Sequence, residues 1–422
     1  MFRQQVYNED TWIDRGGQWI QSDQENIMDY VKLLELKTFK QYAGKGIWAV
    51  FYENAVRFYR GAAPDAESEA AAIDLEEKLD GVAESHGVNE RPWEAQDASA
   101  LDHQTLAQWI SENSKGNEGK DKFARYFVGW QSWTGQSGGS SWETPLLHSL
   151  FERSVNKDSE NSEAYLLVGG AGQIAERLLE EAQKLGTELV SGSKVVAITQ
   201  DGAGVTVTTT PYTSKGVAGT YEAKFAIVAM PPFLSGTIHY DPPLPARRLA
   251  LVQRMPMGTI AKVACIYDNA WWRIEGRSGQ ALGDGNRTVQ YVVDSGNPDK
   301  NTPGILTCFI QGNKYISWST KEEGQRKQIV TDDLRAYFSD GAKPEPCVEY
   351  VEANWPAYPL TGGAYNAYAA VGAWTAYGPS LREPHDRVHW AGTEMATKWY
   401  GEFEGAISAG KTAAKQVLGK LD

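Results

Sequence analysis

A glycine-containing turn that leads into a helix near the C-terminal end holds the densest group of residues that could do chemistry. The stretch from Trp390 to Gly410 reads WAGTEMATKWYGEFEGAISAG and carries Glu394, Glu402 and Glu404 among its glycines. A helix N-terminus presents unpaired backbone N–H groups and a partial positive charge of roughly +0.5. The pattern therefore predicts that an electron-rich group lies against the first turn of this helix. The alternative is an ordinary, well-capped terminal helix.

A lysine in an apolar, strand-like segment is the second candidate. Lys262 stands in TIAKVACIY, between hydrophobic neighbours. Burial disfavours a charged ammonium unless a partner compensates for the lost water. We therefore expect either a functional lysine inside a site or a lysine at a strand edge that points to solvent.

A second glycine turn fits a nucleotide-binding pattern. Residues Gly169 to Ala175 read GGAGQIA, which satisfies G-x-G-x-x-A between a predicted strand and a predicted helix. The acidic residue that should end the next strand is misplaced, because Glu188 stands at the start of TELV, before that strand has run. We interpret GGAGQIA as a turn in which the glycines serve packing.

Composition limits the classes of partner. The 422 residues carry a formal net charge of −13, which disfavours nucleic acid and anionic lipid as partners. Three cysteines, Cys265, Cys308 and Cys347, show neither disulfide-framework nor metal-ligand spacing, so we predict no metal site. No apolar run suggests a signal peptide or a membrane span. These features predict a cytoplasmic protein.

The order of predicted elements indicates two domains woven together, since 422 residues exceed what one core usually supports. A predicted strand, a glycine turn and a predicted helix follow one another at 11–36, 165–186 and 387–421. Helical spacing of apolar residues dominates 64–151. A further helix is predicted at 327–339 within the otherwise extended 233–351. The predicted strands between these parts are 46–60, 187–192, 194–200, 204–210, 221–224 and 225–230, the last an apolar run expected to be buried on both faces.

Several ordered segments resemble the flavin-dependent amine oxidases of the monoamine oxidase type. They are RGGQWIQSDQ (15–24), MPMGTIAK (255–262) and WAGTEMATKWYGEFEGA (390–406), in the order and rough spacing of that family. VAMPPFL, DPPLPARR and GGAY (362–365) are similar to the family as well. The resemblance extends from about Thr11 to Leu418.

The resemblance implies a fold of class α/β plus α+β with two interwoven domains. An FAD-binding, Rossmann-like domain, incomplete at its N-terminus, would comprise 1–60, 165–235 and 353–422. A substrate domain would comprise helices at 61–164 and a mixed sheet at 236–352.

The resemblance also implies roles for individual residues. Lys262 would hold a water against flavin N5, and Tyr365 would form one aromatic wall of the amine site. Ala364 occupies the position where some relatives attach the flavin through cysteine, so a non-covalent FAD is expected. The residues expected to contact the cofactor are Gly16, Gly17, Gln18, Trp19, Val195, Trp355, Gly392, Thr393, Glu394, Glu402 and Phe403.

Glu402 departs from the family pattern. The second aromatic wall should stand directly after Gly401, where this chain has a carboxylate. We hypothesise that Glu402 favours substrates that carry an ammonium group, such as diamines. Trp355 could flank the same cavity or serve as ordinary core packing.

The resemblance implies oxidation of an amine to an imine, with dioxygen reduced to hydrogen peroxide. The expected partners are a small amine and dioxygen, with neither nucleic acid nor membrane, and a homodimer is possible. A desaturase or a porphyrinogen oxidase is a weaker reading of the same fold.

A second departure concerns the start of the chain. Relatives begin with a strand, a GxGxxG turn and a helix, and Met1 falls downstream of that unit. A truncated gene model, a separate subunit that supplies the unit, or a degenerate relative would each explain this. A non-catalytic remnant that binds FAD weakly or not at all is therefore the alternative function.

Overall fold

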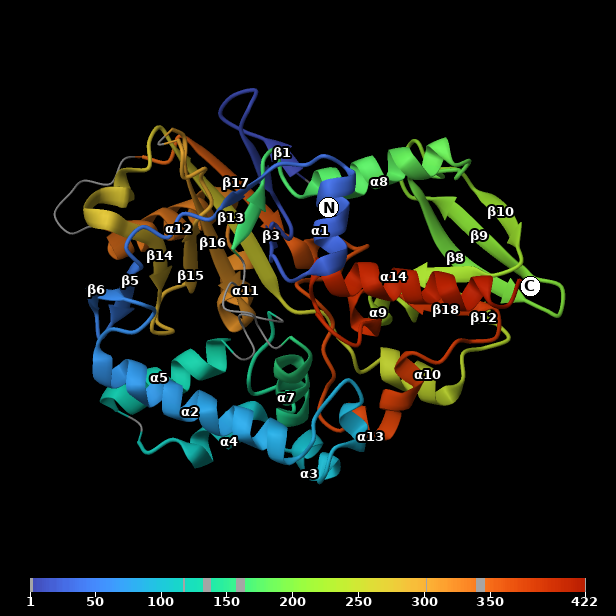
Figure 1. The fold of residues 1–422 in the computed structure, drawn as a ribbon, viewed down its shortest axis with the longest axis horizontal. Helices are drawn as coiled ribbons and strands as arrows, with labels where there is room; N and C mark the ends of the chain where they lie inside the picture. The colour runs from blue at the N-terminus through green and yellow to red at the C-terminus, as the bar shows by residue number, and fades with distance from the viewer. Residues whose placement is uncertain are drawn as a thin grey trace.

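The structure is a computed structural model that describes residues 3–116, 118–131, 138–156, 164–300, 302–338 and 346–421. A mixed sheet of seven strands dominates one half of the molecule (Figure 1). Its neighbours pair antiparallel, except for β14 with β5, which are parallel. In spatial order the strands are β17 (Glu349–Asn354), β13 (Ile260–Tyr267), β16 (Gly304–Gln311), β15 (Tyr291–Asp294), β14 (Arg277–Leu282), β5 (Ile47–Tyr52) and β6 (Ala55–Arg60).

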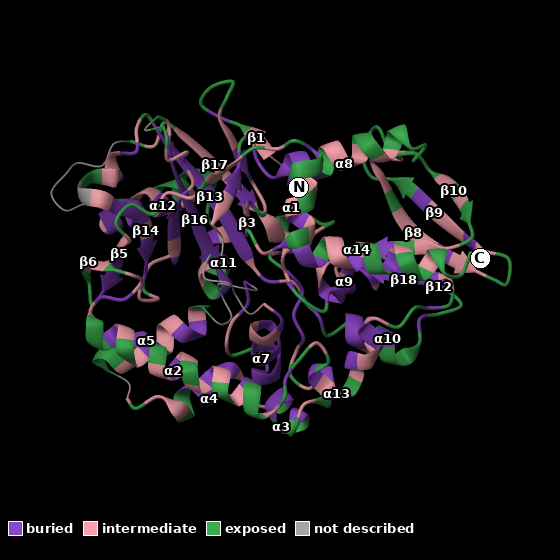
Figure 2. Ribbon diagram, viewed as in Figure 1, coloured by how far each residue is buried: buried purple, intermediate pink, exposed green. Residues whose placement is uncertain are grey.

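The two faces of this sheet have different tasks. Every residue of β13 and β16 is buried, and Figure 2 shows these strands almost wholly in the buried colour. Successive side chains of a strand point to opposite faces. Val263 and Cys265 pack in the core that includes Leu334 and Tyr337 of α12 (Glu323–Phe338). Lys262 therefore projects from the face opposite α12.

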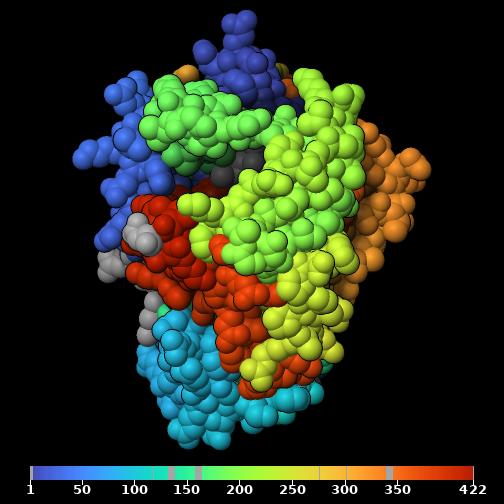
Figure 3. Space-filling view, turned by 90° about the vertical axis from the view of Figure 1, so that its right-hand side faces the viewer, coloured from blue at the N-terminus to red at the C-terminus, as the bar shows by residue number. Residues whose placement is uncertain are grey.

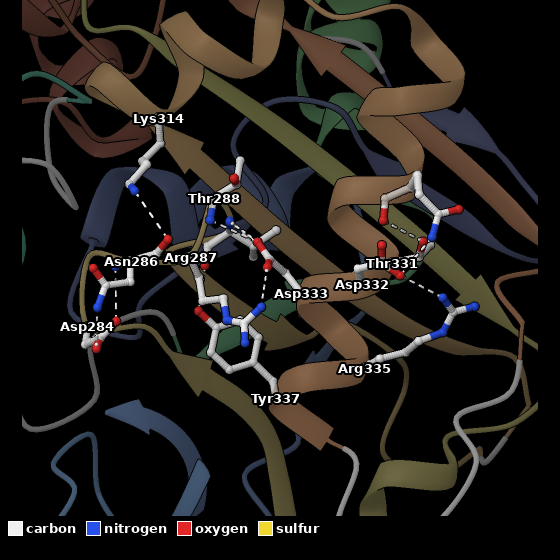
Figure 4. Close-up of polar contacts among 12 residues, drawn as sticks. Asp284, Asn286, Arg287, Thr288, Lys314, Thr331, Asp332, Asp333, Arg335 and Tyr337 are labelled. Carbon is white, nitrogen blue, oxygen red and sulfur yellow. Dashed lines mark hydrogen bonds and ion pairs between the residues drawn. The ribbon is translucent and has the colours of Figure 1, made fainter. Parts of the chain in front are cut away.

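Helix α12 also fixes the loop between β14 and β15 (Figure 4). Asp333 accepts hydrogen bonds from the backbone N–H groups of Thr288 and Val289, both at 2.9 Å, and from Arg287 at 3.3 Å. Burial raises the pKa of Asp333, and these donors oppose that shift. The Tyr337 hydroxyl donates to the carbonyl of Val289 at 2.6 Å. The loop that leads into β15 is thus held from the helix side.

A group of helices lies below the large sheet in the view of Figure 1. Asp65 caps the first of them through the N–H of Ser68, and Thr105 forms a capping box with Gln108. The helices are α2 (Ala66–Ser85), α3 (Ala98–His103), α4 (Leu106–Asn113), α5 (Gly119–Gly129) and α7 (Leu146–Val155).

The other half of the molecule is built from smaller sheets and the terminal helix (Figure 1). Its sheets are β1 (Arg3–Gln5) with β2 (Trp12–Asp14); β3 (Trp19–Ile20), β7 (Tyr165–Leu167) and β4 (Thr38–Lys40); β11 (Ala226–Ala229) with β18 (Val388–Ala391); and β10 (Gly219–Ala223), β9 (Val205–Pro211), β8 (Ser193–Gln200) and β12 (His239–Asp241). Helix α11 (Gly312–Ser319) packs against β13 and β16 of the seven-stranded sheet. Further described helices are α1 (Glu25–Leu33), α8 (Gly172–Lys184), α9 (Pro232–Ser235), α10 (Ala246–Val252), α13 (Ala373–Tyr377) and α14 (Phe403–Leu418). Short 3₁₀ turns occur at Pro92–Glu94, Trp271–Gly276, Trp355–Ala357, Gly378–Leu381 and Thr393–Met395.

Three expectations about individual segments are corrected. Residues 187–192 form no strand. The run 225–230 is not buried on both faces, since Ile227 is 42% exposed. Among the described strands, β11 pairs only with β18. Strands β5 and β6, which we grouped with the FAD-binding part, hydrogen-bond within the seven-stranded sheet instead.

No helix in the described ranges is long and apolar enough to cross a membrane. The same residues contain no cluster of three or more His, Cys, Asp or Glu side chains that could hold a metal ion.

Candidate active site

Lys262 is buried and bonded, not exposed at a strand edge. It is 6% exposed, and its ammonium donates to the carbonyl of Gly16 at 2.7 Å and to the side-chain oxygen of Gln18. The ammonium also lies 5.5 Å from the centre of the Trp19 ring. A buried ammonium is tolerated when acceptors replace its hydration. Strand β13 thereby fastens the glycine loop that connects β2 with β3.

The same loop touches the start of the terminal helix. A Cβ on Gly17 would lie 2.8 Å from the ring of Phe403, and one on Gly16 would lie 3.2 Å from the ring of Trp355. The indole N–H of Trp355 donates to the carbonyl of Arg15 at 3.0 Å. Glycines are therefore required here by close approach, and three distant parts of the chain meet at this loop.

Tyr365 stands at the end of a row of aromatic rings. Its ring centre lies 6.2 Å from that of Phe309, which lies 6.0 Å from Trp19 and stacks on Tyr291 at 5.8 Å. The Tyr365 hydroxyl accepts a hydrogen bond from Gln311 at 3.1 Å. The peptide bond between Ala364 and Tyr365 is cis. Tyr365 therefore borders an apolar, aromatic surface.

The three glutamates of the C-terminal motif have different environments. Glu394 is 2% exposed and accepts the N–H of Ala367 at 2.9 Å, and burial raises its pKa. Glu404 is buried and accepts the N–H of Ile27 at 2.9 Å, at the start of α1. Glu402 is the N-cap residue of α14, and its carbonyl accepts the Thr393 hydroxyl at 3.2 Å. Glu394 and Glu404 therefore stabilise the packing of distant segments against each other.

The GGAGQIA turn carries an internal anion. The carboxylate of Asp14 accepts the N–H of Ala171 at 2.7 Å and that of Gly172 at 3.0 Å, at the N-terminus of α8. Arg3 fills the space beside Gly170 and donates to the carbonyl of Gly169 at 2.8 Å. These two N–H groups are occupied by a carboxylate and are not offered to a phosphate. The geometry agrees with our interpretation of the turn as a structural one.

The candidate residues do not all lie in one place. Gly16 to Trp19, Lys262, Trp355 and Phe403 are linked by the contacts above, and Gly392 and Thr393 join them through Glu402. Val195 stands on β8 in a different sheet, where it packs against the main core cluster. Figure 3 shows a deep hollow framed by the segment of α8, the strands β8 to β10 and the terminal helix.

Sequence reasoning missed several residues of this region. Asp14 and Glu404 each cap a helix that is far away in sequence, with partners 157 and 377 positions along the chain. The sequence indicates Phe309 and Tyr291 only as parts of extended segments. Because every residue of β16 is buried, no alternation of apolar and polar residues marks the face that Phe309 shares with Tyr291. The side-chain oxygen of Gln18, which the resemblance places at the cofactor, accepts a hydrogen bond from Lys262.

The chain is similar to known proteins along nearly its whole length. The family model for flavin-containing amine oxidoreductases matches residues 3–418. An L-amino acid dehydrogenase from Synechocystis sp. is 37% identical over 97% of this chain and 85% of the relative. A probable flavin-containing monoamine oxidase A from Dictyostelium discoideum is 31% identical over 98% of this chain and 88% of the relative.

Solved structures agree with these relatives. A putrescine oxidase with putrescine bound superposes with a TM-score of 0.86 at 26% identity, covering 99% of this chain and 90% of the other. Cyclohexylamine oxidase from Brevibacterium oxydans gives a TM-score of 0.87 at 25% identity, covering 100% and 90%. A family match along nearly the whole chain, supported by a relative of 37% identity, shows that the chain belongs to the flavin-containing amine oxidoreductases, FAD-dependent enzymes that oxidise CH–NH2 groups.

Proposed function

We propose that this enzyme oxidises a primary amine to an imine and passes both electrons to dioxygen. The balanced reaction is R–CH2–NH2 + O2 → R–CH=NH + H2O2, after which water hydrolyses the imine to an aldehyde and ammonia. FAD, when bound, supplies the acceptor for the hydride and returns the two electrons to dioxygen.

The meeting of Lys262, the glycine loop and the start of α14 is the observation that carries this proposal. Glu402 does not cap α14 with its side chain, so the first turn of that helix is available to an electron-rich ring edge. The residues that would hold the isoalloxazine end are the loop from Gly16 to Trp19, the turn from Gly392 to Glu394, and Phe403. With Ala364 in place of a cysteine, the cofactor is bound without a covalent link.

Lys262 and Tyr365 have separate tasks in this scheme. Lys262, held by Gly16 and Gln18, orients a water for proton transfer next to the reacting carbon. Tyr365 directs the neutral amine with its ring and excludes water together with Phe309.

Purified chain reconstituted with FAD tests this proposal. The expected result is a yellow protein that releases its flavin on denaturation and forms peroxide with an amine. Lys262→Met should lower kcat by about 100-fold or more, as loss of a proton-transfer group usually does. Lys122→Met, at an exposed position on α5, is the matched control and should leave kcat unchanged. Protein that stays colourless with added FAD would favour a non-catalytic remnant.

Glu402 is the basis for a substrate preference. Asn366, which follows Tyr365, packs against Gly401, which precedes Glu402, and we infer that the Glu402 carboxylate lines the amine site together with Tyr365. There it would attract the second ammonium of a diamine and repel the carboxylate of an amino acid. Glu402→Gln should reduce the preference for a diamine over a monoamine of equal length by roughly 5-fold, equivalent to about 1 kcal/mol for a partly exposed ion pair. An unchanged preference would remove Glu402 from the selection of substrates.

A second candidate function is the dehydrogenation of L-amino acids, which the relative of 37% identity favours. An enzyme with this function would turn over L-amino acids with an artificial electron acceptor and would form little peroxide in air. Parallel assays of amines and L-amino acids, each with dioxygen and with the artificial acceptor, separate the two candidates.

A further inference from the structure

A buried polar cluster lies directly behind the segment that carries Tyr365. His148 and Ser149 of α7 are fully buried, and Glu152 of the same helix is 1% exposed. These side chains stand within the main hydrophobic core, beside Phe151 and Trp374. A carboxylate in such a place costs several kcal/mol unless it is well bonded. The burial of the Glu152 carboxylate therefore indicates that its hydrogen bonds have a specific role.

The partners of this cluster set the direction of each hydrogen bond. The indole N–H of Trp374 donates to Nδ1 of His148 at 2.9 Å, and an indole nitrogen can only donate. Nδ1 is consequently the acceptor, and the proton of the neutral ring sits on Nε2. Nε2 lies 3.5 Å from Oε1 of Glu152. The same oxygen accepts the side-chain N–H of Asn366 at 3.0 Å.

Asn366 lies where two functional segments cross. It follows Tyr365 in the chain, and its amide nitrogen would be 2.9 Å from a Cβ on Gly401, which has φ +86°. The Tyr400 hydroxyl donates to the carbonyl of Ala367, so the two segments are joined a second time. One segment carries Tyr365 and the other carries the residue after Gly401.

We infer that Glu152 is a positioning residue that sets the spacing between Tyr365 and Glu402 through Asn366. This inference rests on the proposed function for the roles of Tyr365 and Glu402 in amine binding. The carboxylate holds Asn366 against Gly401, and Nε2 of His148, whose ring is bonded by Trp374, lies 3.5 Å from the carboxylate. A shift of about 1 Å in such a site is enough to lower kcat/KM by up to about 100-fold.

The test compares Glu152→Leu with Glu152→Gln. Leucine removes the acceptor for Asn366, whereas glutamine retains an oxygen in the same place. Rates are normalised to bound flavin. Glu152→Leu should raise the KM for amines at least 10-fold and change the ratio of diamine to monoamine turnover, and Glu152→Gln should keep both near the parent values. A loss of folded protein alone would lower the yield without moving either quantity.

Two further variants complete the test. Asn366→Ala removes the same bond from the other side, and the double variant with Glu152→Leu should be no worse than either single variant. Ser149→Ala is the control, since this hydroxyl has no hydrogen-bond partner among the described residues, and it should behave like the parent. If Glu152→Leu does not fold, Asn366→Ala alone carries the test. Parent-like KM and diamine preference in Glu152→Leu or Asn366→Ala would overturn the inference.

A crystallographic comparison separates this inference from the proposed function. The distance between the Tyr365 ring and the Glu402 carboxylate should change by about 1 Å in Asn366→Ala and stay constant in Glu152→Gln. This measurement needs no turnover. A parent chain that oxidises no amine would refute the proposed function, and an unchanged distance would refute the role of Glu152.

Discussion

Replacement of Asp14 by alanine should destabilise the protein through the N-terminus of α8. The carboxylate is 8% exposed and accepts the N–H groups of Ala171 and Gly172 at 2.7 and 3.0 Å. Loss of a helix cap costs about 0.5–2 kcal/mol, and a buried donor left without an acceptor costs about 1–3 kcal/mol. Relief from burying a charge offsets part of this cost, because burial is the main reason that the pKa of Asp14 is raised. We therefore expect a net loss of about 2–4 kcal/mol.

Thermal unfolding of the Asp14 variants measures this loss. With an unfolding entropy of about 2.1 cal/mol/K per residue over 422 residues, the expected fall in Tm is about 2–5 °C. Asp14→Asn keeps one acceptor oxygen and should fall by about half as much. Asp10→Ala removes an exposed carboxylate from the same hairpin and should stay within about 0.5 kcal/mol of the parent. Equal Tm values for Asp14→Ala and Asp10→Ala would refute the capping argument.

Two other predictions concern stability. Burial raises the pKa of Glu394. Between about pH 4.3 and the raised pKa, the native state therefore retains a proton that the unfolded chain has lost. The free energy of unfolding declines as pH rises through this window. The stability of Glu394→Gln relative to the parent should therefore grow over that pH window, and urea titrations between pH 4 and 8 that show a constant difference would contradict this. On α14, the Cβ of Gly410→Ala would meet no atom within 4 Å, so this variant should stabilise the protein by about 1 kcal/mol. The Cβ of Gly405→Ala would lie 2.0 Å from the Trp399 carbonyl oxygen, so this variant should destabilise the protein by about 1–3 kcal/mol or more. Similar Tm shifts for the two alanine variants would show that the first turn of α14 is not close-packed.

Local patterns were sufficient for the elements that carry the site. The apolar run around Lys262 predicted a strand, and the GTE turn and the helix after it were placed correctly. What fixes these elements against one another could not be read from the sequence, because the partners are distant. The bonds from Glu404 to α1 and from Lys262 to Gly16 join residues 377 and 246 positions apart. The pairing of residues 47–60 with β14 of the seven-stranded sheet could not be predicted either, because it depends on tertiary contacts between distant segments.

The alternation of β13 places two neighbouring residues in opposite environments. Lys262 faces the glycine loop, while Val263 belongs to the core beneath α12. Inserting or deleting one residue upstream within this strand would exchange the two sides, which would move the ammonium into the apolar core and away from the glycine loop. A change of length within β13 would therefore destabilise the protein by burying an ammonium without its two oxygen acceptors.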